Sequence, residues 1–272
     1  MIILTVKLNN SKKVYSNKTI VPIIYDSIKL LLANPILFVP KLIIAILYGA
    51  GILLAVDLFK QLVYFQSFTS EQIINFDLSY FFAAATLLFS LAILTYFIDL
   101  FFSGFYPVLV SLAEKKKLSF KEGFILFKPK IGSTLISGVV LWVIITIFSI
   151  LEAVIIFYFN LSSVGFILSF IMTFIFVFIF YFLYPKVVFE NTNLSKTFVD
   201  SLYVSLNNKK LVFVLSLIPF CVSIIKFVLA YFANSAFYLN IFWILVILTG
   251  VVYSIHAVVN QLAFDKLLNS KK

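Results

Sequence analysis

Long apolar segments recur along the chain and are separated by short polar connections. Six of them hold about 20 or more mostly apolar residues, the length a helix needs to cross a bilayer: 35–58, 79–102, 132–157, 164–184, 211–232 and 240–263. A helix that is apolar all round is a deep core helix or a membrane span. The second stretch continues to Ala113, which is too long for one straight span. Either the helix tilts, or Gly104 and Pro107 kink it and its end lies along the inner interface.

This pattern predicts an all-α, polytopic integral membrane protein with six transmembrane helices. Composition agrees, since 63% of the residues are hydrophobic and 12% are charged, whereas soluble domains are about 45–50% apolar and about 25% charged. Too little polar surface is left to cover a water-soluble globule. The N-terminal residues, about 1–20, have only a short apolar stretch and are expected to form a cytoplasmic segment rather than a signal peptide.

Lysines mark one side of the predicted bundle. They gather in the N-terminal segment up to Lys29, in the 114–130 and 185–210 connections and at the C-terminus, whereas the 160–164 and 233–239 turns hold none. The 57–78 connection holds one lysine and three acidic residues. Because lysine-rich loops stay in the cytoplasm, we expect a multi-pass protein of the cell membrane with both termini cytoplasmic.

Two cytoplasmic connections resemble each other. The segment 25–37 aligns without gaps on 199–211, and the shared positions include Asp-Ser and a later Asn. The matched residues are Asp26, Ser27 and Asn34 in the first copy and Asp200, Ser201 and Asn208 in the second. Each copy precedes a span that starts on the cytoplasmic side, and the aspartates are expected near the first turn of an interfacial helix, where a carboxylate complements the helix dipole.

The third such span, 132–157, is preceded by Ser119 and Glu122, which have the spacing of a capping box at a helix start. One membrane domain, 1–272, is therefore predicted to hold three units at roughly 21–113, 114–184 and 185–272. Each unit would be an amphipathic interfacial helix followed by a transmembrane hairpin. The alternative to a repeat is that the two Asp-Ser segments match by chance.

The amphipathic helix with Asp-Ser and a following Asn, repeated across six spans, resembles YciC-like prokaryotic membrane proteins. It is also similar to the membrane domain fused to some glycerophosphodiester phosphodiesterases. The middle unit departs from this pattern with Glu122-Gly123 in place of Asp-Ser. The resemblance implies a helical membrane fold and no defined chemistry, and the phosphodiesterase activity is not carried over.

Five ionisable residues lie inside apolar spans, where a charge costs about 2.5–3.5 kcal/mol at the helix centre. Counting along the helices at about 1.5 Å per residue sorts them into an inner set (Lys41, Asp99, His256) and an outer pair (Glu152, Lys226). Each group contains both signs, as expected if the charges pair. The alternatives are structural pairing, snorkelling of the lysines to the nearer interface, and a path for a substrate or protons.

Several kinds of site are not expected. One histidine and one cysteine in the chain make a metal centre improbable, and no cofactor is predicted. No nucleophile-elbow sequence supports a Ser-His-Asp triad built from His256, Asp99 and a serine. The absence of arginine disfavours a nucleic-acid surface.

Three functions fit these observations. The first is non-enzymatic handling of a lipid or an amphipathic solute at the inner leaflet, where lysine clusters at 115–117, 128–130 and 209–210 would attract anionic headgroups at about 1 kcal/mol per lysine. The second is a scaffold or accessory subunit that binds another membrane protein or further copies of itself. The third is a small permease whose path includes Lys41, Asp99 and His256.

Overall fold

The computed structural model describes residues 20–65, 78–158, 162–190, 193–232 and 239–269, and these residues form helices and no strands. The expected N-terminal segment lies almost entirely outside this part. The long helices are α2 (Val39–Phe65), α4 (Leu78–Glu114), α6 (Ile131–Tyr158), α7 (Ser162–Ile179), α10 (Lys209–Phe232) and α11 (Leu239–Asn269). The short ones are α1 (Ile20–Ala33), α5 (Phe120–Phe127), α8 (Leu183–Phe189) and α9 (Leu194–Asn207), with 3-10 turns η2 (Pro35–Phe38) and η3 (Lys128–Lys130).

By length and composition, the described chain holds five membrane-spanning candidates, or six if α9 and α10, which meet at 106°, form one broken span. The predicted all-helical membrane protein is confirmed at this level. The fourth predicted span corresponds to the candidate Ile167–Phe189, within which α7 ends at Ile179 and a turn precedes α8 at Leu183.

Helix α4 runs through Gly104 and Pro107 without a break. Its 37 residues extend roughly 56 Å at 1.5 Å each, well beyond a hydrocarbon core of about 30 Å. The last turns do not lie on the surface. Leu109 and Val110 are fully buried, and α5, α8 and α11 pack against this helix. The extra length therefore forms the centre of the hydrophobic core.

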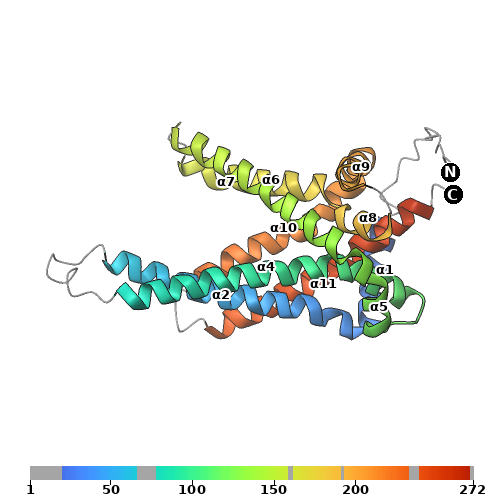
Figure 1. Ribbon diagram of the computed structural model, residues 1–272, viewed down its shortest axis with the longest axis horizontal. Coiled ribbons are helices and arrows are strands. Elements are labelled where there is room, and N and C mark those ends of the chain that lie inside the picture. Colours follow the sequence, from blue (N-terminus) through green and yellow to red (C-terminus); the bar gives the residue numbers. More distant parts are fainter. Residues whose placement is uncertain (1–19, 66–77, 159–161, 191–192, 233–238, 270–272) are drawn as a thin grey trace.

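The helices spread apart away from this core. Helices α2, α4, α10 and α11 pack along one another, and the α6–α7 hairpin runs at an angle to them and diverges toward its tip (Figure 1). Small residues allow the closest approach. A Cβ atom added at Gly250 of α11 would lie 3.0 Å from the backbone of Leu42 and 3.2 Å from Ala45 Cβ on α2.

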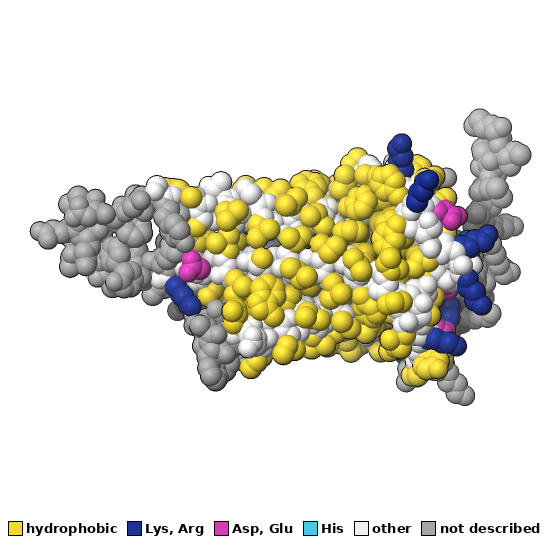
Figure 2. All heavy atoms as spheres, turned by 90° about the horizontal axis from the view of Figure 1, so that it is seen from below, with side chains coloured by type: hydrophobic (Ala, Val, Ile, Leu, Met, Phe, Trp, Pro, Cys, Tyr) yellow, Lys and Arg dark blue, Asp and Glu magenta, His cyan; other side chains and the backbone are white. Residues whose placement is uncertain are grey.

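Helices α1, α5 and α9 lie at the end of the molecule where α11 ends at Asn269 (Figure 1). Each buries one face and exposes large apolar side chains on another, among them Leu32, Ile125 and Val199. Lysines gather at the same end, as Figure 2 shows on the face in view. Exposed apolar residues next to lysines are typical of helices at a membrane interface.

The matched Asp-Ser segments form similar helices, each with 14 residues. The serines Ser27 and Ser201 are both fully buried. The amides of Asn34 and Asn208, just after each helix, donate to the carbonyl four residues earlier, at 3.0 and 2.9 Å.

The expected position of the aspartates is wrong. Asp26 and Asp200 each lie six residues after the first residue of their helix, so neither is in the first turn. The reason is which face of each helix is buried. Ser27 and Ser201 point into the protein, so the aspartate before each serine lies at the edge of the buried face. Asp26 there accepts from Lys266 of α11 at 3.0 Å. The Ser119 cap on Glu122 is present, at 3.3 Å.

Candidate functional site

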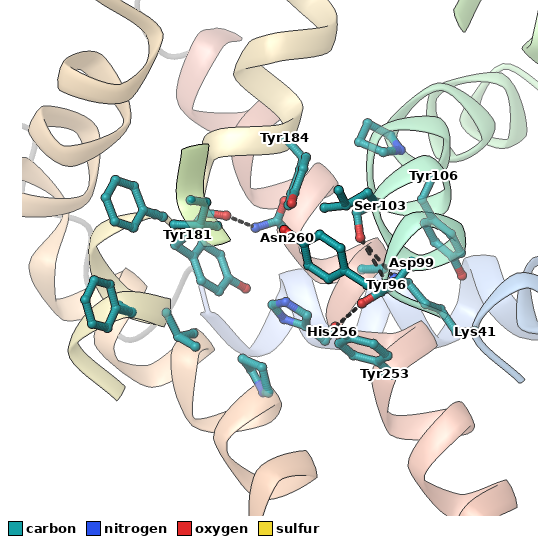
Figure 3. Close-up of a pocket in the computed structure, with 18 of the residues that line it drawn as sticks. Lys41, Tyr96, Asp99, Ser103, Tyr106, Tyr181, Tyr184, Tyr253, His256 and Asn260 are labelled. Carbon is teal, nitrogen blue, oxygen red and sulfur yellow. Dashed lines mark hydrogen bonds and ion pairs between the residues drawn. The ribbon is translucent and has the colours of Figure 1, made fainter. Parts of the chain in front are cut away.

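A cavity of about 350 Å³ lies between α4 and the α6–α7 pair and is also lined by α2, α8, α10 and α11. Its walls differ in chemistry. The polar wall comes mainly from α2, α4, α8 and α11, and Figure 3 shows most of its side chains converging on one space. It includes Lys41, Asp99, Ser103, His256, Asn260 and the tyrosines Tyr48, Tyr96, Tyr106, Tyr181, Tyr184 and Tyr253.

An ion pair lies at the centre of the polar wall. Lys41 Nζ is 2.9 Å from Asp99 Oδ1, and the lysine is 3% exposed against 16% for the aspartate side chain. Ser103 Oγ accepts from Lys41 at 3.3 Å and donates to Asp99 at 3.4 Å. Because Pro107 has no N–H, the carbonyl of Ser103 also lacks the usual intrahelical donor.

Tyr253 connects this pair to the histidine. Its hydroxyl donates to Asp99 Oδ2 at 3.4 Å, and Lys41 Nζ lies 4.3 Å from the centre of its ring, a cation–π distance. The imidazole of His256, three residues further along the same face of α11, stacks with the Tyr253 ring at 6.2 Å between centroids and an interplanar angle of 10°. The inner set predicted from the sequence therefore gathers at one cavity.

The histidine does not complete a catalytic triad. Nδ1 of His256 is buried without a hydrogen-bond partner, and Ser103 contacts the Lys41–Asp99 pair instead. A triad histidine would use both ring nitrogens, one toward the serine and one toward the aspartate. Within the part of the chain that the structure describes, no group of three or more His, Cys, Asp or Glu side chains is placed to hold a metal ion.

Tyr181 provides a second polar atom without a partner. Its hydroxyl is buried and makes no hydrogen bond, while its backbone carbonyl accepts from Asn260 at 2.5 Å. Its ring meets that of His256 edge to face at 5.5 Å, and Figure 3 shows the phenol pointing toward the imidazole. A hydroxyl and an imidazole nitrogen at one place can bind a group that donates and accepts hydrogen bonds.

The cavity opens toward the side of the bundle. Its other wall is apolar and comes from α6, α7 and the turn after α7, with Leu141, Trp142, Ile145, Phe176, Val177 and Phe180. Trp142 is 53% exposed and Ile145 is 37% exposed. Both lie in the middle of α6, roughly 17–21 Å from its first residue. In a helix that crosses a bilayer, side chains at that distance from the helix start lie in the hydrocarbon region.

The tyrosines were not predicted from the sequence, although a signal existed. Within two spans, polar residues recur at helical spacings of three and four, which puts them on one face. They are Tyr96, Asp99, Ser103 and Tyr106 on α4, and Tyr253, His256 and Asn260 on α11. Tyrosine is counted among the hydrophobic residues in the composition, so this stripe is hidden unless its hydroxyl is considered.

The outer pair is only partly described. Glu152 of α6 accepts a hydrogen bond of 2.6 Å from Ser169 of α7. Lys226 belongs to α10, but its side chain lies outside the described residues, so the predicted pairing stays a prediction. Glu152 and Ser169 line a second cavity of about 290 Å³ between α6 and α7.

Comparisons of the chain with protein-family models, with curated proteins and with solved structures each gave no match.

Proposed function

We propose that this protein binds an amphipathic molecule, such as a membrane lipid, without catalysing a reaction on it. The polar group occupies the tyrosine-lined cavity, and the apolar part lies against α6 and α7. The observation that carries this proposal is that one wall of the cavity is polar and the other is apolar, within the length of the membrane-spanning helices. An ion pair, tyrosines and a histidine face one side, while exposed Trp142 and Ile145 face the other.

The charges of the cavity favour a hydrogen-bonding group over a strongly charged one. Lys41 and Asp99 already neutralise each other, and Tyr253 and Ser103 occupy further sites around the pair. The hydroxyl of Tyr181 and Nδ1 of His256 have no such partner. A buried polar atom without a partner costs about 1–3 kcal/mol, and both atoms are almost inaccessible as the side chains stand. A ligand hydroxyl or amide that shifts the neighbouring side chains and bonds to these atoms therefore gains affinity.

The proposal includes a membrane orientation with six spans. Helix α10 has 24 residues, roughly 36 Å, so it can cross the core of about 30 Å without α9. Helix α9 then lies at the interface, as its 106° angle to α10 allows. The positive-inside rule puts the lysine-rich end, with α1, α5, α9 and both termini, in the cytoplasm of a cell membrane. The cavity then lies in the inner half of the bilayer, near anionic headgroups.

The likeness of α1 and α9 extends this proposal to a repeated unit. Both helices bury a serine at the same position and end in an asparagine that bonds back to the preceding turn. Helix α5, with its Ser119 cap, starts the middle unit at the same end of the molecule. The common role of the three helices is to hold the chain at the inner interface.

Photolabelling tests the binding proposal. The purified protein in nanodiscs receives a phospholipid with a diazirine in its acyl chain, and the labelled peptides are identified by mass spectrometry. Label is expected on α6 and α7 around Trp142 and Phe180. Ala257→Trp, which fills the cavity from α11, should abolish it, whereas Ile247→Trp on the exposed face of α11 should not. Equal labelling of the two variants contradicts the proposal.

A second candidate is a scaffold or accessory subunit of another membrane protein. Helix α6 favours it, because none of the most apolar stretch of this helix is buried within the protein. Phe157 is 90% exposed and Ile150 is 58% exposed. A protein that co-purifies in fixed proportion in mild detergent, and is lost on replacing Ile150 by Glu, would favour this reading over lipid binding.

A further inference from the structure

The two cavities adjoin each other along one face of the α6–α7 hairpin. The second cavity shares three lining residues with the first, namely Ile145, Phe176 and Val177. Trp142 lines the first cavity and Glu152 the second, and the two residues are ten positions apart on α6, roughly 15 Å along the helix. The pair of cavities therefore covers a large part of the bilayer thickness.

Both cavities contain polar groups, although the residues they share are apolar. The second holds the Glu152–Ser169 hydrogen bond of 2.6 Å and is also lined by Ser149 and Thr173. A carboxylate inside a span is costly and typically marks the path of a polar or charged group. Ile145, Phe176 and Val177 lie between two polar regions, as residues of a hydrophobic constriction do.

We propose that this protein moves the headgroups of lipids between the two leaflets along this face of α6 and α7. The proposal rests on the proposed function, since the first cavity is the inner binding site. The headgroup passes from the tyrosine-lined cavity, across the Ile145–Phe176–Val177 constriction, to Glu152 and Ser169, while the acyl chains stay in the bilayer. The movement runs down the concentration difference between the leaflets.

The acidic residues define the substrate class. Asp99 in the first cavity is neutralised by Lys41, whereas among the described side chains that line the second cavity the charged one is Glu152, which accepts a hydrogen bond from Ser169. A headgroup with an ammonium group, or an uncharged headgroup with hydroxyls, suits such a path. An anionic headgroup is repelled by Glu152, so zwitterionic and uncharged lipids are the expected substrates.

Proteoliposomes with a tail-labelled fluorescent phosphatidylcholine in both leaflets test the proposal. Dithionite added outside destroys the outer fluorescence at once, and the inner fraction follows only when lipid crosses. Vesicles with the protein should lose nearly all fluorescence, and empty vesicles only the outer share. A soluble fluorophore trapped inside must keep its signal, because its loss would mean leakage. Failure of the protein to speed the loss overturns the proposal.

Substitutions at the constriction sharpen the test, since a gain of rate cannot come from unfolding. Ile145→Ser should speed transfer about tenfold, the effect of lowering the barrier by about 1.4 kcal/mol, and Ile145→Trp should slow it. Ile147→Ser, at a residue 52% exposed on α6 and outside both cavities, is the matched control. Equal rates for Ile145→Ser and Ile147→Ser contradict the assigned path.

Two further measurements test the substrate class and separate lipid binding from lipid transfer. Tail-labelled phosphatidylglycerol should cross more slowly than phosphatidylcholine, and Glu152→Gln should reduce this difference. If both lipids cross equally in the unaltered protein, the assigned substrate class is wrong. Photolabelling at the first cavity without any transfer would leave the proposed function standing and refute only the movement. The absence of both would refute the proposed function as well.

Discussion

The ammonium group of Lys41 on α2 lies 2.9 Å from the carboxylate of Asp99 on α4, and the lysine is almost completely buried. The two residues are 58 positions apart in the sequence and lie on adjacent helices that pack together. A pair of this kind contributes little net stability compared with apolar residues, but removal of one partner leaves the other charge buried alone.

Breaking the pair should therefore destabilise the protein. Asp99→Asn is expected to cost about 3–5 kcal/mol, seen as a lower melting temperature in detergent. Lys41→Met should cost less, because Tyr253 and Ser103 still donate to the remaining carboxylate. The double variant should recover part of the loss. Strictly additive losses would show that the two residues are not coupled.

His256 should matter for binding more than for stability. Its ring stacks on Tyr253 and meets Tyr181 edge to face, while Nδ1 has no partner. His256→Phe keeps an aromatic ring there, so the melting temperature should change little, while lipid photolabelling falls. His256→Ala should lower both the melting temperature and the lipid photolabelling. The loss of stability should include about 0.5–1.5 kcal/mol for each aromatic contact. A large loss of stability in His256→Phe would mean that a polar contact of the imidazole holds the fold.

The contact between α2 and α11 should be sensitive to side-chain size at Gly250. A valine there would collide with Leu42 and Ala45, whose nearest atoms would lie 2.8–3.2 Å from the new Cβ. The expected loss is about 1–3 kcal/mol, as for overpacking elsewhere, measured by thermal unfolding in detergent. Gly132→Ala, where nothing lies within 4 Å, is the control and should stabilise α6 slightly.

The two asparagines that follow α1 and α9 should have equal effects if the units are duplicates. Asn34→Ala and Asn208→Ala each remove a side-chain bond to the carbonyl four residues earlier. A net loss of about 0.5–1.5 kcal/mol is expected for each, with the two losses alike in melting experiments. If one variant is neutral and the other unfolds the protein, the helices do not share a role.

The proposed orientation can be tested by labelling single cysteines in intact cells, after Cys221 has been replaced by alanine. Sites at 69, 163 and 235 are expected outside, and sites at 116, 193 and 270 inside, because lysines are held in the cytoplasm. A membrane-impermeant maleimide should therefore react only with the first group. One site on the wrong side would change the number of spans.

The first cavity should be closed to water-soluble reagents from the cytoplasmic side. Its exposed residues, Trp142 and Ile145, lie at mid-helix on α6. A cysteine at position 145 should therefore react with a lipid-soluble maleimide much faster than with a charged one. Similar rates with both reagents would show that water reaches the cavity, and a soluble substrate would become the better reading.

The sequence by itself determined the helical membrane class, the gathering of lysines at the ends of certain spans, and a helix at each of the two Asp-Ser segments, expected at about 22–34 and 195–208. These properties depend on local composition and periodicity, because lipid leaves the backbone few alternatives to a helix. It also placed Lys41, Asp99 and His256 at similar depth, since depth follows from residue counting along a helix.

Only the tertiary structure decided which faces of the helices meet. It put Asp26 at a contact edge instead of in a first turn, gave Glu152 a serine partner, and brought tyrosines from α2, α4, α8 and α11 to one cavity. Hydropathy cannot separate a tyrosine that faces lipid from one that faces a cavity, because the helix is the same in both cases. The rotation of each helix is set by close packing between helices, such as that at Gly250, and packing depends on residues far apart in the sequence.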